Sequence, residues 1–412
     1  MQYRIRKSIQ SAPAVIYLPA SKSINNRLLI MSALSGGNIS LKNVSESDDS
    51  RIMKNLLDSN DTIKNAGHAG TVMRFMTAYL SLQEGRYILT GTDRMKERPI
   101  GELVNALREL GADIEYVEKD GFPPLRITGR KLNGGSIKIN SGISSQYISA
   151  MMMIGPFLKK GLEIILEGDT ISSSYIDLTA GLMTRAGANV IRKGEIINIA
   201  SGNFKMMEME VEADWSSASY WFSIVGLSGI QEIILPKLSE QSLQGDSAIR
   251  KIFEKIGVGS EFIEEGLKVF PIPVKNNSLI FDFRNNPDMV QTIIPYCIAK
   301  NIVFSFSGCR SLRIKETDRV SALYRELNKF GVSIEFSDDG DQISWNGTSK
   351  PEWNREVTIE TYHDHRMALG FAPLSLLTGQ LVIRDPAVVS KSYPGFWVDL
   401  KKAGFRIEEV SR

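Results

Sequence analysis

The stretch LRELGADIEYV, residues 107–117, takes an amphipathic helix into a glycine and then directly into a strand. The same pattern returns in LMTRAGANVIR (182–192), IFEKIGVGSEFI (252–263), LNKFGVSIEF (327–336) and LKKAGFRIEEV (400–410). The glycines stand at positions 111, 187, 257, 331 and 404, so successive copies are 76, 70, 74 and 73 residues apart. Glycine suits this place because it readily adopts the left-handed conformation that releases a helix into a strand. Although such junctions are common in α/β proteins, the near-constant spacing indicates an internal repeat.

A repeat of this length holds more than one strand and one helix. Between Gly111 and Gly187 we predict strands at 112–117, 124–128, 136–139 and 162–167, and helices near 145–157 and 175–186. A weaker copy, MKNLLDSNDTI (53–63), precedes Gly111 by only 53 residues when counted from Asp58. The sequence therefore predicts an α/β (α+β) protein of six repeats, three in each of two domains. We expect the short first repeat to have lost a hairpin.

Length and composition are those of an ordinary globular protein. The 412 residues exceed what a single core usually holds, and 42% of them are apolar and 23% charged. A net charge of +2 provides no overall field for nucleic acid or membrane, so we predict neither as a partner. Cys297 and Cys309 form no CxxC pattern and no long apolar segment occurs, which favours a cytoplasmic protein.

Several predicted helices begin with more hydrogen-bond donors than capping requires. PASKSINNR (19–27) opens one with Ser21, Lys22, Ser23 and Arg27. Similar openings, and one basic loop, lie in GHAGTVMRF (67–75), RMKERPI (94–100), SGISSQYIS (141–149), ISSSYIDL (171–178), RIKETDRV (313–320), HDHRMAL (363–369) and SKSYPGF (390–396). Helix N-termini attract anions through free N–H groups and a partial positive charge, and Lys and Arg strengthen this attraction. If these openings converge, they suit substrates with several negative charges.

Each opening also has an ordinary structural explanation. A serine at a helix start is usually only a cap, and KETDR alone is more typical of a salt-bridged, solvated helix face. Asp288 in NNPDMVQTI (285–293) is favoured by the helix dipole in any case. His363 and His365 form an HxH pair, but His68 is the only other histidine, so we predict no metal site. Phosphate-loop, dinucleotide and serine-nucleophile motifs are absent from the sequence, which leaves a small organic phosphate as the expected ligand and no cofactor.

Taken in order along the chain, these motifs resemble those of the 5-enolpyruvylshikimate-3-phosphate (EPSP) synthase family, the 3-phosphoshikimate 1-carboxyvinyltransferases. The resemblance rests on LPASKSINNR, AGTVMR, RMKERPIG, SSQY, SSSYIDLT, NPDMVQT, RIKETDR, DHRMA and the SKSYPGF that follows DP. It implies the two-lobed enolpyruvyl transferase fold, with three βαββαβ-type repeat units around buried helices in each lobe. Lobe one would comprise residues 1–19 and 214–412, and lobe two residues 20–213, with the active site in the cleft between them.

The resemblance also implies a reaction and its substrates. The enolpyruvyl group of phosphoenolpyruvate would pass to the 5-hydroxyl of shikimate 3-phosphate by addition and elimination, with release of phosphate. This step belongs to the shikimate pathway towards chorismate and the aromatic amino acids. The enzyme would be a cytoplasmic monomer that needs no cofactor.

Carried over motif by motif, the resemblance implies roles for single residues. The catalytic set is Asp288 as proton acceptor, Glu316 as the carboxyl that exchanges protons with the methylene carbon, Lys22 and Lys315. The shikimate 3-phosphate set is Lys22, Ser23, Arg27, Ser144, Ser145, Gln146, Ser172, Tyr175, Asp288 and Lys315. The phosphoenolpyruvate set is Lys22, Gly70, Arg94, Gln146, Arg319, Arg366 and Lys391.

Two other functions stay open at this point. The sister transferase that acts on UDP-N-acetylglucosamine uses a loop cysteine and an Asn after the equivalent lysine, whereas here Ser23 follows Lys22 and Cys297 lies in an apolar helix. A non-catalytic anion- or RNA-binding module would combine exposed aromatic and basic residues, whereas the five tryptophans here are scattered.

Overall fold

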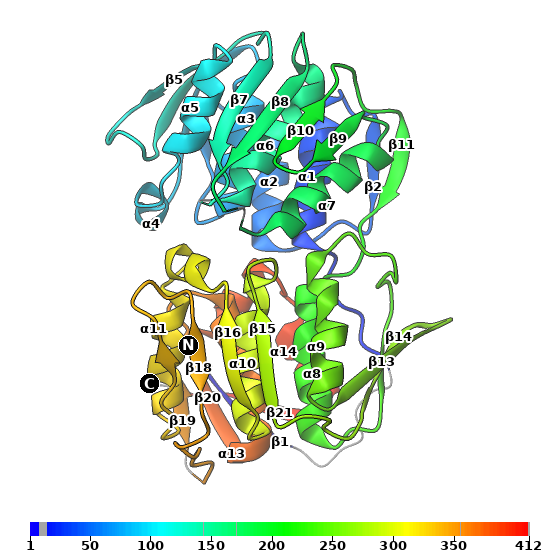
Figure 1. The fold of residues 1–412 in the computed structure, drawn as a ribbon, viewed down its shortest axis with the longest axis vertical. Coiled ribbons are helices and arrows are strands. Elements are labelled where there is room, and N and C mark those ends of the chain that lie inside the picture. Colours follow the sequence, from blue (N-terminus) through cyan, green and yellow to red (C-terminus); the bar gives the residue numbers. More distant parts are fainter. Residues whose placement is uncertain (8–14, 143, 170, 355, 411–412) are drawn as a thin grey trace. The chain divides into compact units, whose positions relative to one another are not determined.

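The computed structural model describes residues 1–7, 15–142, 144–169, 171–354 and 356–410, so Ile143 of the SGISSQY stretch lies outside the description. The chain divides into two compact units (Figure 1). Unit 1 comprises Met1–Pro19 and Glu212–Arg412, and unit 2 comprises Ala20–Val211. The chain thus enters unit 2 after Pro19 and returns to unit 1 after Val211, two residues before the expected end of lobe two.

Unit 2 is built from helices and three small sheets. Its elements in chain order are α1 (Lys22–Leu34), β2 (Ile39–Lys42), α2 (Asp48–Asp58), β3 (Ile63–Asn65), α3 (Gly70–Leu80), β4 (Gly85–Thr90), α4 (Asp93–Lys96), α5 (Gly101–Glu109), β5 (Asp113–Tyr116), β6 (Leu125–Gly129), β7 (Gly135–Asn140), α6 (Ser145–Ile154), the 3₁₀ helix η1 (Gly155–Phe157), β8 (Leu162–Glu167), α7 (Ser173–Arg185), β9 (Val190–Lys193), β10 (Ile196–Ile199) and β11 (Met207–Glu210). The RMKERPI stretch, expected to be a loop, begins in the short helix α4.

Unit 1 has the same kinds of element. They are β1 (Gln2–Lys7), α8 (Trp215–Ser228), β12 (Ile233–Leu235), η2 (Gly245–Ala248), α9 (Ile249–Lys255), β13 (Val258–Ile263), β14 (Gly266–Pro271), β15 (Ser278–Asp282), η3 (Pro287–Met289), α10 (Val290–Ala299), β16 (Val303–Ser307), η4 (Arg310–Ile314), α11 (Arg319–Asn328), β17 (Glu335–Phe336), β18 (Ile343–Trp345), β19 (Val357–Ile359), α12 (His365–Phe371), η5 (Ala372–Leu374), α13 (Ser375–Thr378), β20 (Gln380–Arg384), η6 (Pro386–Lys391), α14 (Phe396–Lys402) and β21 (Phe405–Val410).

One strand arrangement recurs in four sheets. Their orders are β3-β4-β6-β5, β7-β8-β10-β9, β15-β16-β18-β17 and β19-β20-β1-β21. In each sheet the first two strands are parallel and the other neighbours are antiparallel. Along the chain three of these repeats run strand, helix, strand, helix, strand, strand, and in the fourth the last strand, β1, comes from the N-terminus. This order agrees with the strands and helices predicted between Gly111 and Gly187 and differs from the βαββαβ order that the resemblance implied. The mixed α/β class and the repeat of four strands and two helices are confirmed.

The two remaining sheets are variants of this repeat. The order β12-β14-β13 is extended by a parallel bridge between Val15 and Ile234. The sheet of the short first repeat contains only β11 and β2 among the described residues, as its short spacing leads one to expect. Here α2 ends at Ser59 without a glycine, and the buried Lys64 ammonium donates instead to the carbonyls of Leu56 (2.8 Å) and Ser59 (2.5 Å).

The repeated glycines adopt the conformation that the sequence predicts. Their φ angles are +95° at Gly111, +86° at Gly187, +105° at Gly257, +78° at Gly331 and +89° at Gly404. Each glycine follows the second helix of its repeat and leads the chain into the next strand; at Gly404 this strand is β21, which pairs with the N-terminal β1. The need for a positive φ angle at this junction therefore explains why glycine recurs there at near-constant spacing.

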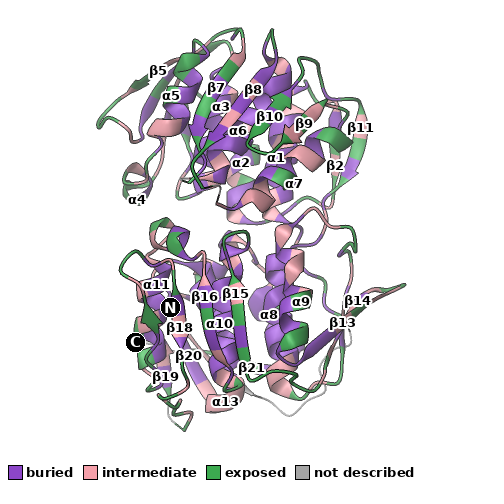
Figure 2. Cartoon of the chain, viewed as in Figure 1, coloured by how far each residue is buried: buried purple, intermediate pink, exposed green. Residues whose placement is uncertain are grey.

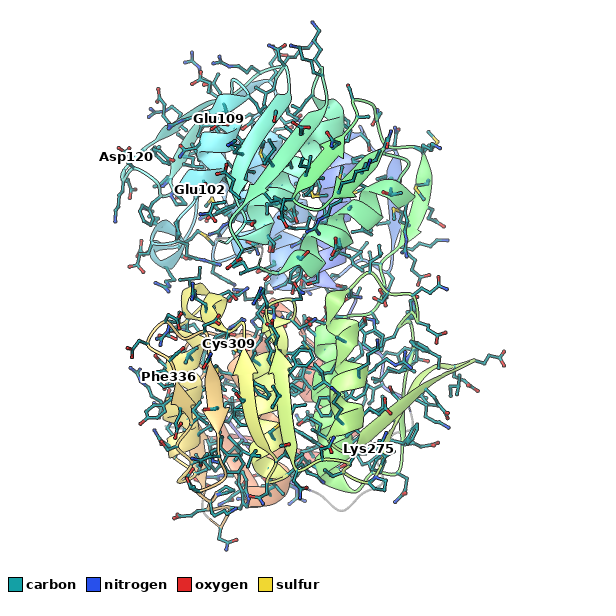
Figure 3. All side chains as sticks on the ribbon, viewed as in Figure 1. Glu102, Glu109, Asp120, Lys275, Cys309 and Phe336 are labelled. Atoms are coloured by element: carbon teal, nitrogen blue, oxygen red, sulfur yellow. The ribbon has the colours of Figure 1, made fainter. Side chains whose placement is uncertain are left out.

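The first and second helices of a repeat differ in burial. In α10 every residue from Val290 to Ile298 is buried, as Figure 2 shows. The outer helix α5 buries Leu103 and Leu107 but directs Glu102 and Glu109 away from the core (Figure 3). The six first helices, α1, α3, α6, α8, α10 and α12, thus supply much of the core of their units. No described helix combines the length and apolarity needed to cross a membrane.

We predict that Gly111→Ala destabilises the protein by about 1–2 kcal/mol. A Cβ at Gly111 would meet no atom within 4 Å, so the cost comes from the positive φ angle alone. Gly202 is the matched control, because its Cβ position is equally open and its φ angle is not positive. Urea unfolding should show a lowered midpoint for Gly111→Ala only; equal midpoints for both variants would contradict this explanation.

Candidate active site

In unit 2, four helices meet around the buried guanidinium of Arg27, one turn into α1. Its Nε donates to Thr179 Oγ1 (2.7 Å) in α7, and its Nη2 donates to Ser149 Oγ (3.0 Å) in α6. The guanidinium lies 5.4 Å from the ring centroid of Phe75 in α3 and 5.8 Å from that of Tyr175. Burial lowers the pKa of Arg27 to about 10. Among the described residues no carboxylate pairs with Arg27, so its charge is balanced only by neutral oxygens and rings.

The helix starts named in the sequence gather in this region. Since the partners of Arg27 stand three to seven residues into their helices, and a helix rises about 1.5 Å per residue, all four starts lie within about two turns of it. Ser23 contributes its carbonyl, which accepts from Arg27 Nη1 (2.9 Å), and the Tyr175 carbonyl accepts from Nη2 (3.4 Å). Gln146 Nε2 donates to Thr71 Oγ1 (3.1 Å), which joins the starts of α6 and α3.

Lys22 opens α1 and already has a carboxylate partner. Its Nζ lies 3.2 Å from Asp49 Oδ2, in the first turn of α2. Asp49 Oδ1 is buried and has no hydrogen-bond partner among the described residues, and the same holds for Ser21 Oγ at the α1 N-cap. The start of α1 therefore combines an ammonium with buried polar atoms that are not fully satisfied.

The serines of α6 and α7 take up cap positions. Ser144 is the N-cap of α6 and accepts from the Gln146 amide (3.3 Å), and Ser145 is the first residue of that helix and is buried. Ser172 is the N-cap of α7 and has a left-handed backbone, with φ +56° and ψ +39°. No side-chain cap bond from Ser172 occurs within the described residues, so its hydroxyl does not serve as an ordinary cap.

The surroundings of Gly70 favour Arg98 over Arg94. An ideal Cβ at Gly70 would lie only 2.6 Å from Arg98 Nη1 and 2.9 Å from Arg74 Nη1. Arg74 also donates to the carbonyl of Pro99 (3.2 Å), which ties α3 to the RMKERPI stretch. Arg94, by contrast, is exposed and forms an ion pair with Glu97 (2.8 Å). The guanidinium beside the α3 start is thus that of Arg98.

In unit 1, one buried arginine binds three carboxylates. Arg319, the first residue of α11, is 1% exposed. Its Nε lies 2.7 Å from Asp364 Oδ2, its Nη1 2.9 Å from Asp288 Oδ1, and its Nη2 3.1 Å from Glu316 Oε2. Burial alone would lower the pKa of Arg319, but the three carboxylates raise it above the ordinary value.

Two further cations bind the same carboxylates. Arg366 Nη2 lies 2.9 Å from Asp288 Oδ2, and Arg366 Nη1 donates to Tyr220 Oη (3.3 Å) in α8. Lys391 Nζ lies 2.9 Å from Glu316 Oε1. The structure thereby brings together, in unit 1, residues that the sequence placed in four separate motifs.

Asp288 is ionised in this cluster. Burial alone would raise its pKa, but the positive charges of Arg366, Lys315 and Arg319 hold it well below its ordinary value. The pKa of Lys315 is lowered, mainly by burial and further by Arg319 and Arg366, while Asp288 and Glu316 oppose the shift. Within the described residues no hydrogen bond or ion pair joins the Lys315 ammonium to a partner. Lys315 thus adds positive charge that the cluster leaves unpaired.

Asp246 lies next to the cluster and contacts it through Ser216. No motif in the sequence indicated this residue. It is buried in η2 and accepts from Ser216 Oγ, which in turn accepts from Arg366 Nη2 (3.4 Å). Burial raises the pKa of Asp246 to about 6, and the charge of Asp288 acts in the same direction. While Asp246 is protonated, four cations (Lys315, Arg319, Arg366, Lys391) face three carboxylates (Asp288, Glu316, Asp364), which leaves one positive charge in excess.

The motifs did not point to the acids that pair with these cations. Asp49, Asp364 and Asp246 each act on a cation that the motifs had named, and Asp364 stands inside the DHRMA block itself. A search for acids beside the cationic motifs would have found Asp364. Asp49 and Asp246 lie 27 and 120 residues from the cations Lys22 and Arg366, so no local pattern reveals them.

The described residues contain no group of three or more His, Cys, Asp or Glu side chains arranged to hold a metal ion. Cys297 and Cys309 are both buried free thiols, and burial raises the pKa of Cys309 to about 12 and that of Cys297 further. Neither cysteine has the lowered pKa of a nucleophile.

Comparison with known proteins agrees with the motifs. The family model described as EPSP synthase (3-phosphoshikimate 1-carboxyvinyltransferase) matches residues 53–400. The chain belongs to the EPSP synthase family. A relative from Bacteroides fragilis, named 3-phosphoshikimate 1-carboxyvinyltransferase, is 46% identical over 96% of both chains. A relative of the same name from Photobacterium damsela subsp. piscicida is 34% identical over 94% of this chain and 96% of its own.

The fold of the EPSP synthase family is found again among solved structures. An EPSP synthase from Acinetobacter baumannii matches with a TM-score of 0.75 and covers 99% of this chain and 100% of its own. At 20% sequence identity this match is evidence of the fold alone. The resemblance drawn from the sequence motifs is confirmed.

Asp246 predicts a pH-dependent contribution to stability. Because its pKa is raised to about 6 in the folded state, folding favours its protonated form. Stability should therefore fall as the pH rises from about 4 to above 6, by at most about 3 kcal/mol. We predict that Asp246→Asn, which keeps an acceptor for Ser216, gains stability relative to the parent protein over this range. Urea unfolding at pH 4.5 and pH 8 measures the difference, and parallel pH profiles of the two proteins would contradict the prediction.

Proposed function

We propose that this protein transfers the enolpyruvyl (carboxyvinyl) group of phosphoenolpyruvate to the 5-hydroxyl of shikimate 3-phosphate and releases phosphate. The observation that carries the proposal is the buried cluster of cations around Asp288 and Glu316 in a member of the EPSP synthase family. Cations that are held by movable carboxylate partners can exchange them for the phosphate and carboxylate of a substrate. The relatives named as this transferase support the same activity.

Binding of the two substrates divides among the helix starts. We propose that phosphoenolpyruvate binds Arg319, Arg366 and Lys391 in unit 1 together with Lys22, Gly70 and Gln146 in unit 2. The half-buried Arg98 joins this set, because its guanidinium lies against Gly70. Arg94, exposed and paired with Glu97, is the weaker member. Shikimate 3-phosphate would bind the Ser23, Arg27, Ser144, Ser145, Gln146, Ser172 and Tyr175 group, with Lys22, Asp288 and Lys315. The two clusters would thus act on one pair of substrates.

Asp288 is proposed to accept the proton of the attacking hydroxyl. In the structure its pKa is held well below the ordinary value, so the carboxylate is ionised but weakly basic. A substrate carboxylate at Arg366 or Arg319 would compete with Asp288 for these guanidinium groups. Substrate binding would then raise the pKa of Asp288 towards that of an effective base.

Glu316 is proposed to supply and remove the proton at the methylene carbon. Each of its oxygens faces a cation, since Oε1 lies 2.9 Å from Lys391 Nζ and Oε2 lies 3.1 Å from Arg319 Nη2. Lys22 and Lys315 would stabilise the negative charge that develops on the leaving phosphate. Burial lowers the pKa of Lys315, which makes release of its proton easier than from an exposed lysine.

The two other functions have less support. Both cysteines are buried and have raised pKa values, which does not suit the cysteine-dependent transferase that acts on UDP-N-acetylglucosamine. The small net charge does not favour an RNA-binding module. We further propose that the protein is cytoplasmic and monomeric. Sedimentation of the purified protein measures its oligomeric state.

Phosphate release with both substrates tests the function directly. We predict release only when phosphoenolpyruvate and shikimate 3-phosphate are both present. Asp288→Asn keeps the shape of the side chain but removes its charge, and it should lower kcat by roughly 10²–10⁴-fold. Phosphate release from phosphoenolpyruvate alone, or no phosphate release with both substrates present, would contradict the proposal. Normal turnover by Asp288→Asn would remove Asp288 from the role of base.

Gly70→Ala tests the phosphoenolpyruvate site in unit 2. The new Cβ would lie within 3 Å of the guanidinium groups of Arg98 and Arg74, so both side-chain ends must shift and charged contacts are lost. We predict a KM for phosphoenolpyruvate raised by about 10- to 100-fold, with an unchanged KM for shikimate 3-phosphate. Arg98→Ala should raise the same KM more than Arg94→Ala does. The opposite ranking of these two arginine variants would restore Arg94 as the binding residue.

A further inference from the structure

A tight turn leads from β19 into α12 with two residues in the left-handed conformation. Tyr362 has φ +52° and His363 has φ +57°, and the Asp364 amide donates to the Thr361 carbonyl (2.8 Å). Two central residues with positive φ define a type I′ turn, which normally contains Gly, Asn or Asp. A positive φ is uncommon for any residue with a Cβ and least expected for the bulky Tyr362, so the surrounding structure must hold this pair of residues.

The residues after this turn belong to the cationic cluster. Asp364 Oδ1 accepts from the Arg366 amide (2.9 Å), and Asp364 Oδ2 lies 2.7 Å from Arg319 Nε. Arg366 follows Asp364 by two residues and reaches Asp288. The backbone conformation of the turn therefore sets the positions of Asp364 and Arg366.

A buried carboxylate holds the turn from the side of α11. Glu326 is 0% exposed. Its Oε1 accepts from Tyr362 Oη (2.7 Å), and its Oε2 accepts from the Glu360 amide (3.0 Å) and from Lys329 Nζ (2.7 Å). Lys329 Nζ also donates to the Thr358 carbonyl (2.8 Å). One carboxylate thus binds the chain just before the turn and the side chain of its first left-handed residue.

Helix α11 therefore holds both ends of the same segment. Arg319, its first residue, binds Asp364 after the turn, and Glu326, seven residues later, binds Glu360 and Tyr362. Seven residues span about 10 Å along a helix. Because a helix is stiff over this length, the positions of Asp364 and Glu360 are coupled.

We propose that Glu326 is a positioning residue for the reaction: it holds the Tyr362–His363 turn and thereby fixes Asp364 and Arg366 in the cluster. The catalytic part rests on the proposed function, whereas the hold on the turn does not. Glu326 reaches the cluster only through the turn and through α11.

Glu326→Gln tests this role at nearly constant volume. The amide has one acceptor oxygen instead of two and carries no charge, so it cannot accept from all three donors and loses the ion pair with Lys329, and the turn loses part of its support. We predict that kcat falls by on the order of 10²-fold, the scale of a displacement of about 1 Å, while the KM for shikimate 3-phosphate is retained. Hydrogen exchange of the amides in residues 360–367 should become faster. Tyr362→Phe, which removes one hydroxyl bond, should show the same changes to a smaller extent and serves if Glu326→Gln does not fold.

A rescue experiment separates positioning from loss of stability. His363→Gly removes the left-handed strain and should restore most of the kcat of Glu326→Gln. Asn301→Gly is the matched control, because Asn301 also has a positive φ (+56°) in unit 1 but lies between α10 and β16. Both glycines should stabilise the fold, and only His363→Gly should restore turnover.

Each outcome of these experiments decides one claim. Equal rescue by the two glycines, an unchanged kcat in Glu326→Gln, or unchanged exchange at residues 360–367 would overturn the positioning role. An inactive parent protein with faster exchange in Glu326→Gln would instead refute the proposed function and leave the hold on the turn supported.

Discussion

Unit 1 depends on a guanidinium that is buried among three acids. Arg319 is almost inaccessible, and its carboxylate partners come from η3, from the segment before α11 and from the start of α12. Taking a cation out of water costs several kcal/mol, and only well-placed opposite charges offset that cost. Removing one partner leaves a buried charge uncompensated, a loss of about 3–5 kcal/mol. The folded unit therefore holds these elements in one arrangement, and that arrangement is also the proposed binding site.

The same cluster explains why an enzyme for acidic substrates can have almost no net charge. With a formal charge of only +2, attraction of anions depends on local organisation rather than on an overall field. Helix starts provide partial positive charge, and Lys22, Arg27 and Arg366 provide whole charges at those starts or within two turns of them. Lys391 provides a further charge from the end of η6, so SKSYPGF does not open a helix as expected. Most of these cations already have protein partners in the structure. We propose that an incoming phosphate or carboxylate replaces protein acids at the same cations and thereby changes the basicity of Asp288.

The repeat supplies these helix starts in a regular way. Each complete repeat places one buried helix between two parallel strands, so α3, α6, α10 and α12 begin at equivalent points of their sheets. The second helix is followed by a glycine with positive φ that releases the chain into the next strand. Where the repeat is shortened, Lys64 satisfies the carbonyls at the end of α2. At Tyr362 and His363 the backbone is strained instead, and the buried Glu326 provides the compensating contacts.

The amino-acid sequence alone determined the repeat, its glycine junctions, the cationic motifs and the family, because these depend on short-range backbone preferences and on residues close together in the chain. The order of elements predicted between Gly111 and Gly187 also holds, whereas the βαββαβ order implied by the resemblance was wrong. The sequence did not determine the acids that pair with the named cations. Asp49 and Asp246 meet Lys22 and the Arg366 cluster only after the chain has folded, since they come from other helices. The sequence also did not determine that Arg98, and not Arg94, lies beside Gly70. Both arginines stand in one motif, and only the path of the chain through α4 decides which side chain faces α3. Burial, which changes the pKa of Asp246, Lys315 and Asp288, is a property of packing and has no counterpart in the linear sequence.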